Sequence, residues 1–144
     1  MILTDSTAGF SPVSALTRSE VLDHAKYPRN RGVLPGAAVV REEVNPLCGD
    51  VVTMYATFAA SGDQTHPAVQ AASFDGHGCL LTVAAASMLT ERVAGLPCTD
   101  ILRMGREDME ALLGGEVSPS RVKCVLLPLI ALKKGIQHGL SLYV

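Results

Sequence analysis

Residues 68–93 read AVQAASFDGHGCLLTVAAASMLTERV and contain, in order, a strand, a sharp break and a helix. Ala68–Phe74 has the short apolar pattern of a strand, and Asp75-Gly76-His77-Gly78 is a run of turn-forming residues. Cys79–Val93 is rich in small and apolar residues and carries no charge before Glu91, which is typical of a buried helix. We therefore expect a strand to lead directly into a buried helix that begins at Cys79.

Two further strands are predicted before this stretch. Ala37–Val44 and Val51–Ala59 are rich in β-branched residues, and the alternating pattern of the second fits a sheet with one buried face. The turn-forming sequence NPLCGD, residues 45–50, separates the two strands. Ahead of them, Thr17–Glu20 has the spacing of a capping box, and Pro28 is expected to end the short helix that begins there.

Helices are expected to fill the chain after the quoted stretch. One is capped by Thr99 or Asp100 and runs to about Leu113. Another occupies residues 121–142, with Pro128 near the beginning of its regular part, since proline is tolerated in a first turn. Because the strands come together in the chain and most of the helices follow them, the sequence predicts an α+β domain.

The chain has 144 residues, a length that suits one domain. Because 48% of the residues are apolar and the mean hydropathy is +0.28, we expect this domain to have its own hydrophobic core. We expect a flexible leader over residues 1–16 and a single domain over 17–144.

The 12 basic and 14 acidic residues give a net charge of −2 without a charged block, so nucleic acid is not an expected partner. The longest apolar run has nine residues, against the roughly 18 that span a membrane. Since the first residues also lack a signal-peptide pattern, we expect a cytoplasmic protein without a membrane partner.

Three cysteines and one aspartate form the candidate site. Cys48 and Asp50 flank Gly49 in a predicted turn, Cys79 stands at the start of one helix, and Cys124 lies near the start of another. The partial positive charge at a helix N-terminus lowers the pKa of a thiol and favours the thiolate. Three thiolates and a carboxylate make a tetrahedral ligand set for Zn²⁺, or for iron in a cluster.

The same residues allow other interpretations. Each cysteine, and Cys98 above all, could be a small buried apolar residue, because the chain contains no CxxC pair. Cys79 and His77 could be the nucleophile and base of a small hydrolase, although no third orienting group is evident. A purely structural zinc module is a further alternative, although an apolar core of this size needs no metal to fold.

Four stretches resemble the U-type iron–sulfur cluster assembly family, which includes the IscU and SufU scaffolds and the N-terminal domain of NifU. They are residues 23–32 (DHAKYPRNRG), 45–50 (NPLCGD), 74–79 (FDGHGC) and 121–124 (RVKC), the last followed by Leu127-Pro128. Residues 86–91 (ASMLTE) also resemble the buried helix of the family. Together these stretches extend over nearly the whole chain, and the three cysteines and the aspartate are all in place.

The resemblance implies a three-stranded antiparallel sheet packed against about four to five helices. It implies that Cys48, Asp50, Cys79 and Cys124 bind metal, and that the three cysteines hold a transient [2Fe-2S] cluster. Cys124 is expected to accept the persulfide, and Lys123 beside it to support the thiolate electrostatically. The implied protein is a scaffold rather than an enzyme: it takes sulfur from a cysteine desulfurase, binds iron, and transfers the cluster to apo iron–sulfur proteins.

Two branches of the family differ around the last cysteine. Lys123 stands where the Isc type has a histidine. A lysine at this position resembles the Suf type, whose members belong to the SUF system. Residues 118–123 (SPSRVK) do not match the Isc-type motif read by a dedicated chaperone, so that partner is not expected. The short interval between Cys79 and Cys124 resembles the Isc type, because the Suf type usually has an insertion there. The alternative function is a zinc-dependent sulfurtransferase that relays persulfide from the desulfurase to a separate scaffold.

Overall fold

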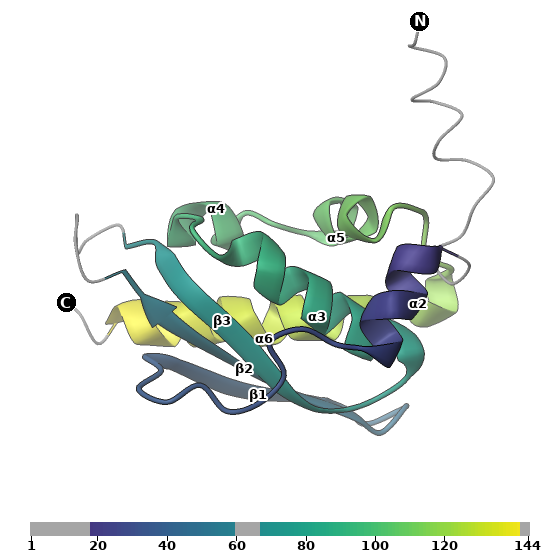
Figure 1. Cartoon of the computed structure of the whole chain (residues 1–144), viewed down its shortest axis with the longest axis horizontal. Helices are drawn as coiled ribbons and strands as arrows, with labels where there is room; N and C mark the ends of the chain where they lie inside the picture. The colour runs from purple at the N-terminus through teal and green to yellow at the C-terminus, as the bar shows by residue number, and fades with distance from the viewer. Residues whose placement is uncertain (1–17, 60–66, 142–144) are drawn as a thin grey trace, which may run out of the picture.

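The computed structural model describes residues 18–59 and 67–141 (Figure 1). Their elements, in order, are α2 (Ser19–Lys26), β1 (Val39–Asn45), β2 (Asp50–Phe58), β3 (Val69–His77), α3 (Leu80–Val93), α4 (Cys98–Leu102), α5 (Arg106–Leu113), the 3-10 turn η2 (Pro119–Arg121) and α6 (Val122–Ser141). The predicted α+β class, with a three-stranded antiparallel sheet and four to five helices, is confirmed. The predicted leader over residues 1–16 lies outside the described residues. The capping box expected at Thr17–Glu20 is wrong, because the N-cap residue of α2 is Arg18, which makes no side-chain capping hydrogen bond.

The sheet is antiparallel throughout, with the strand order β1-β2-β3. β1 and β2 form a hairpin whose last pair is Asn45 with Asp50, so residues 46–49 make the connecting loop. Along β2 every second side chain, from Asp50 to Phe58, is buried, and the side chains between them are partly exposed. The predicted alternation is confirmed, and it shows which face of the sheet carries the core.

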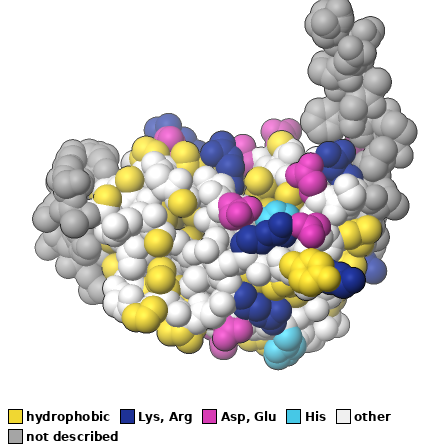
Figure 2. Space-filling model, viewed as in Figure 1, with side chains coloured by type: hydrophobic (Ala, Val, Ile, Leu, Met, Phe, Trp, Pro, Cys, Tyr) yellow, Lys and Arg dark blue, Asp and Glu magenta, His cyan; other side chains and the backbone are white. Residues whose placement is uncertain are grey.

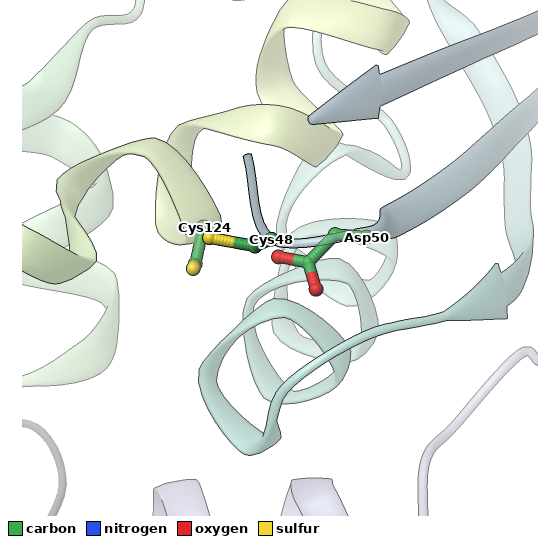
Figure 3. A group of neighbouring side chains, drawn as sticks. All are labelled: Cys48, Asp50 and Cys124. Carbon is green, nitrogen blue, oxygen red and sulfur yellow. The ribbon is translucent and has the colours of Figure 1, made fainter. Parts of the chain in front are cut away.

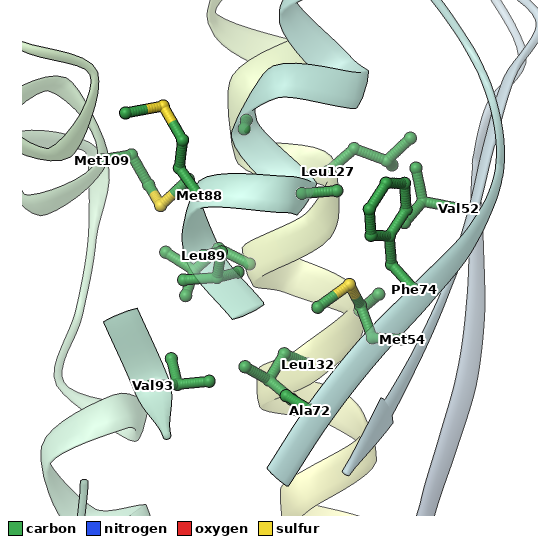
Figure 4. Packing of buried hydrophobic residues seen from close by; sticks show 14 of the residues in the cluster. Val52, Met54, Ala72, Phe74, Met88, Leu89, Val93, Met109, Leu127 and Leu132 are labelled. Carbon is green, nitrogen blue, oxygen red and sulfur yellow. The ribbon is translucent and has the colours of Figure 1, made fainter. Parts of the chain in front are cut away.

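Helices α3 and α6 cover the buried face of the sheet. α3 lies against β3, α6 lies against β1 and β2, and the two helices pack against each other. Figure 4 shows Met54 and Phe74 of the sheet gathered with Leu89 of α3 and with Leu127 and Leu132 of α6. α3 buries most of its circumference, as its apolar sequence predicts, because α2 and α5 also pack against it.

β3 extends further than the sequence predicts. Residues 75–77, which were expected to form a turn, continue the strand and pair with β2 as far as His77 opposite Val51. Gly76 makes this possible with a φ of +127°, a conformation that other residues rarely adopt. Because the pairing continues to the beginning of β2, Cys79 emerges directly beside Asp50.

Two expectations for the helices after α3 are wrong. The helix expected to end at Leu113 is divided into α4 and α5, because Gly105 takes an extended conformation and caps α5. Pro128 is not in the first turn of its helix, since α6 already begins at Val122. Proline has no N–H, so the Cys124 carbonyl lacks the hydrogen bond that residue 128 donates in a regular helix. The helix continues because it buries side chains such as Val125 and Leu132 in the core.

The described surface carries charges of both signs. On the face drawn in Figure 2, Lys and Arg side chains are interspersed with Asp and Glu, and no large area has a single sign. Ion pairs on the surface include Arg41 with Glu43 at 2.9 Å and Arg106 with Glu110 at 3.5 Å. Among the described helices, none has both the length and the apolar character needed to cross a membrane.

A polar network holds α2 and the following segment against α3. The His24 Nδ1 lies 2.7 Å from the Ser87 hydroxyl, and the Ser87 oxygen accepts a hydrogen bond from the Arg29 N–H at 2.8 Å. The His24 Nε2 lies 3.6 Å from the Glu91 carboxylate. Burial of the imidazole lowers the pKa of His24 below 6.5, and the Arg29 guanidinium lowers it further against the opposing effect of Glu91.

We expect the protein to lose stability as the pH falls below 6.5, in part because of His24. The unfolded chain binds a proton at His24 before the folded protein does, so this contribution is fully present above pH 6.5 and is lost as the pH falls through the lowered pKa. Replacing His24 with glutamine should remove this part of the pH dependence. Urea unfolding of both proteins across that range measures it, and parallel pH profiles would contradict the assignment.

Candidate functional site

Four side chains from separate parts of the fold line one pocket at the end of the sheet. Cys48 comes from the β1–β2 loop, Asp50 begins β2, Cys79 precedes α3, and Cys124 lies in the first turn of α6. The pocket has a volume of ≈ 480 Å³. The structure therefore brings together all four ligands that the sequence predicts.

Three of these ligands are close enough to share one metal ion. The Cys48 Sγ, an Asp50 carboxylate oxygen and the Cys124 Sγ all lie within 4.8 Å of one another, and Figure 3 shows Asp50 beside the two cysteines. Cys79 is outside this group of three, although it lines the same pocket. A four-ligand centre therefore requires the Cys79 Sγ to approach the other three ligands.

Two donors at the N-terminal end of α3 hold the Asp50 carboxylate. Its Oδ1 accepts a hydrogen bond from the Cys79 N–H at 3.2 Å, and its Oδ2 accepts one from the Thr82 hydroxyl at 2.9 Å. The same hydroxyl lies 3.4 Å from the Cys79 Sγ. The N-cap residue of α3, Cys79, makes no side-chain capping hydrogen bond. The carboxylate of Asp50, which belongs to β2, instead accepts a hydrogen bond from the backbone N–H at this end of the helix.

Sequence reasoning missed Thr82. The signal that could have found it is its place three residues after Cys79, since residues at that spacing lie on the same face of a helix. Thr82 is also the one hydroxyl residue in the otherwise apolar residues 80–86, and a buried hydroxyl needs a hydrogen-bond partner.

The pKa values of the Cys79 and Cys124 thiols shift in opposite directions. Burial raises the pKa of Cys79, but hydrogen bonds with Thr82, Cys124 and the backbone outweigh burial and leave this pKa below 9.0. Burial raises the pKa of Cys124, and its hydrogen bonds with Cys79 and Asp50 raise it further. In the metal-free protein Cys79 therefore loses its proton before Cys124.

The ligands differ in their access to solvent. Cys48 is exposed and Cys79 is half-buried, whereas Asp50 and Cys124 are only 2% and 3% exposed. Cys79, the N-cap residue of α3, and Cys124, in the first turn of α6, both line the pocket, and the partial positive charge at a helix N-terminus favours thiolates there. The site is thus open on the side of Cys48 and enclosed around Cys124.

The basic residue that lines the pocket is Arg121, within the described part of the chain. Lys123 is exposed and lines a neighbouring groove together with Pro46 and Leu47. The electrostatic support expected of Lys123 for Cys124 would therefore act from outside the pocket. The helix geometry explains this, because successive residues of α6 point in different directions.

His77 and Cys98 take different places from the ligands. His77 lines the pocket and is exposed. The side chain that contacts the Cys79 thiol from α3 is Thr82, in the described part of the chain. Cys98 is 1% exposed at the start of α4 and does not line the pocket; burial raises its pKa to about 11. These placements support Cys98 as a buried apolar residue and weaken the nucleophile–base pair of Cys79 with His77.

Two glycines allow the ligands to approach each other. Gly49 has a φ of +75°, in the left-handed region that suits glycine, and it turns the loop between Cys48 and Asp50. At Gly78 a Cβ would lie 2.9 Å from the Asp50 Oδ1 and 3.0 Å from the Thr82 Cβ. Any larger residue at position 78 would therefore displace the carboxylate.

The donor set fits zinc or iron. Thiolates are soft ligands that both metals accept, and three thiolates with one carboxylate complete a tetrahedral shell without a histidine. Fold and site together define the class: an α+β protein with a candidate Cys₃Asp metal site in a pocket where two helices begin. The family model of the NifU-like N terminal domain matches residues 16–140, and the chain belongs to this family.

Curated relatives in this family carry two kinds of name. The chain is 36% identical over 141 residues to the zinc-dependent sulfurtransferase SufU of Bacillus subtilis (strain 168), covering 86% of this chain and 91% of that protein. It is 31% identical over 146 residues to the iron-sulfur cluster assembly scaffold protein IscU of Streptococcus pyogenes serotype M1, covering 90% and 87%. The chain is therefore a relative of iron–sulfur cluster assembly scaffolds and of a zinc-dependent sulfurtransferase alike.

Solved structures of related proteins have the same fold as this chain. The crystal structure of FiSufU from Fervidobacterium islandicum AW-1, described as a cluster assembly scaffold protein for the SUF system, superposes with a TM-score of 0.64 at 28% identity. The match covers 83% of this chain and 95% of that chain. The N-terminal NifU-like protein from Brucella abortus superposes with a TM-score of 0.69 at 21% identity, which shows the shared fold.

Proposed function

We propose that this protein is a cytoplasmic scaffold on which sulfur and iron combine into a transient [2Fe-2S] cluster. The observation that carries the proposal is the approach of Cys48, Asp50 and Cys124 to within 4.8 Å, with Cys79 in the same pocket. The open side at Cys48 lets a sulfur donor and a cluster acceptor reach the centre. The scaffold name of the Streptococcus pyogenes relative supports the same function.

The carboxylate ligand suits a protein that must release what it builds. A carboxylate is a harder ligand than a thiolate and binds iron more weakly in a cluster. Asp50 is also held by the Cys79 N–H and the Thr82 hydroxyl, so it keeps hydrogen-bond partners when the cluster leaves. We infer that apo iron–sulfur proteins receive the cluster and that no dedicated chaperone takes part.

Cys124 is our candidate for the persulfide acceptor. Its thiolate attacks the outer sulfur of a persulfide on a cysteine desulfurase; a new S–S bond forms on Cys124, and the desulfurase cysteine leaves as a thiolate. Cys79 lines the same pocket and has a pKa below 9.0, so its thiolate can take up the proton of Cys124. Pro128 leaves the Cys124 carbonyl without its helical hydrogen bond, which lowers the cost of moving this turn toward the donor.

A zinc-dependent sulfur relay is the second candidate function. One observation favours it: Cys48 is exposed on a glycine-containing loop, whereas the other three ligands are wholly or partly buried. In such a relay zinc would hold the thiols until the desulfurase displaces one of them, and the exposed Cys48 is the easiest to displace. The sulfurtransferase name of the Bacillus subtilis relative supports this alternative.

One anaerobic experiment separates the two functions. The pure protein is mixed with a cysteine desulfurase, cysteine, Fe²⁺ and a thiol, and visible absorption is recorded together with alanine production. For a scaffold we expect a charge-transfer band that co-elutes with this protein and passes to an apo-ferredoxin. Faster alanine production with bound zinc and no co-eluting band would identify the relay instead. Absence of both effects would contradict both functions.

Chelation tests the structural zinc alternative. The metal-free protein should stay folded, because the core between the sheet and helices α3 and α6 does not include the pocket ligand Asp50 or the exposed Cys48. Circular dichroism before and after chelation measures this, and loss of the helical signal would indicate a structural metal.

A further inference from the structure

Thr82 occupies a position in which one hydroxyl touches two of the proposed ligands. Its Oγ1 donates to the Asp50 Oδ2 at 2.9 Å and lies 3.4 Å from the Cys79 Sγ. Thr82 is 0% exposed, so water cannot replace either contact. A hydroxyl has one proton to donate and lone pairs with which to accept, and it can therefore join a carboxylate and a thiol in one chain of hydrogen bonds.

The two hydrogen bonds to Asp50 orient its carboxylate without blocking it. One comes from the Cys79 backbone and the other from Thr82, and each falls on a different oxygen. A carboxylate oxygen has two lone pairs, so each oxygen keeps one for a further partner. The backbone donor alone leaves the carboxylate free to rotate about that single bond, and the second donor removes this freedom.

The neighbourhood adds to this restraint. Gly78 lies so close that a Cβ there would be 2.9 Å from the Asp50 Oδ1. Asp50 is therefore enclosed by the first turn of α3 on one side, while its carboxylate lies within 4.8 Å of the Cys48 and Cys124 sulfurs on the other. Thr82 is the only one of the two donors that a side-chain substitution can remove.

We propose that Thr82 is a positioning residue of the metal centre, whose hydroxyl fixes the orientation of the Asp50 carboxylate for metal binding and lies beside the Cys79 thiol. This inference rests on the proposed metal-binding function of the pocket and adds to it a residue outside the ligand set. Partners of metal ligands act by fixing ligand orientation, and their loss costs about 10–100-fold in metal affinity.

The test compares three variants with the unchanged protein. Thr82→Val replaces the hydroxyl by a methyl group of similar size, and Thr82→Ser keeps the hydroxyl. The matched control is Thr90→Val, because Thr90 lies on the same helix, is 1% exposed and also uses its hydroxyl in hydrogen bonds, with Ser87 and Asn30. Zn²⁺ affinity is measured by competition with a chromophoric chelator, and Co²⁺ provides a visible spectrum that reports ligand geometry.

We expect Thr82→Val to weaken Zn²⁺ binding by about 10–100-fold and to weaken the tetrahedral Co²⁺ bands. Thr82→Ser and Thr90→Val should bind within about threefold of the unchanged protein, even if Thr90→Val unfolds at a lower temperature. If Thr82→Val does not fold, Thr82→Ala removes the same hydroxyl with less bulk and should show the same loss. Thermal unfolding of each metal-free variant shows whether a loss of Zn²⁺ affinity is accompanied by a loss of folding stability.

The outcomes distinguish this inference from the function on which it rests. Unaltered Zn²⁺ affinity and Co²⁺ bands in Thr82→Val, with normal binding by the unchanged protein, would overturn only the role of Thr82. An equal loss in Thr90→Val would also overturn it, because the loss would then come from α3 as a whole. Failure of the unchanged protein to bind either metal through its thiols would overturn the metal centre itself.

Discussion

Replacing Cys124 with serine is expected to lower the Zn²⁺ affinity about a hundredfold and to abolish sulfur acceptance. A structural zinc site binds with roughly 10–16 kcal/mol, so one of four ligands accounts for about 3 kcal/mol, or about two powers of ten. Cys124 contributes one of the three donors that already lie within 4.8 Å of one another. Chelator competition measures the affinity, and mass spectrometry after incubation with a desulfurase and cysteine measures the added sulfur.

The matched control for this experiment is Cys98→Ala. Cys98 is also buried, at 1% exposed, but it does not line the pocket, so its loss should leave metal binding and sulfur acceptance unchanged. Cys48→Ser completes the comparison, because Cys48 is the exposed ligand. If Cys124→Ser still gains sulfur and Cys48→Ser does not, Cys48 is the acceptor, and the zinc relay becomes the better account of the function.

Replacing Gly76 with alanine is expected to destabilise the protein by about 2–6 kcal/mol. Its φ of +127° is strained for any residue with a side chain, which costs about 1–3 kcal/mol. A Cβ there would also lie 2.9 Å from the Val51 carbonyl carbon and closer still to its oxygen, and such overpacking costs typically about 1–3 kcal/mol more. Urea unfolding under reducing conditions measures the loss.

Gly95→Ala separates these two contributions. Gly95 has a φ of +89°, but a Cβ at this position would meet nothing within 4 Å, so only the conformational cost of about 1–2 kcal/mol is expected. Gly76→Ala should in addition weaken metal binding, because the end of β3 leads directly to Cys79. Equal destabilisation by the two substitutions, with normal metal binding, would contradict the close packing of β3 on β2 at this point.

The strands and the buried helix could be predicted because their signals are local. The alternation along β2 follows from the two-residue period of a strand, and the apolar stretch from Cys79 onward is buried on nearly every side as expected. The regions that could not be predicted are those where distant contacts outweigh local preference. Gly76 continues β3 because β2 offers it a partner, and α6 runs through Pro128 because burial of its neighbours outweighs one lost hydrogen bond.

The amino-acid sequence by itself determined the four candidate ligands, the α+β class and the family, because residue identity and local period are sufficient for these. Only the tertiary structure decided how the ligands meet: Cys48 exposed, Cys124 buried, and Asp50 held by Thr82. It also placed Arg121 in the pocket and Lys123 outside it. The exposure of these site residues, the distances between them and their hydrogen-bond partners depend on how α3 and α6 pack on the sheet. Local patterns in the sequence do not predict that packing.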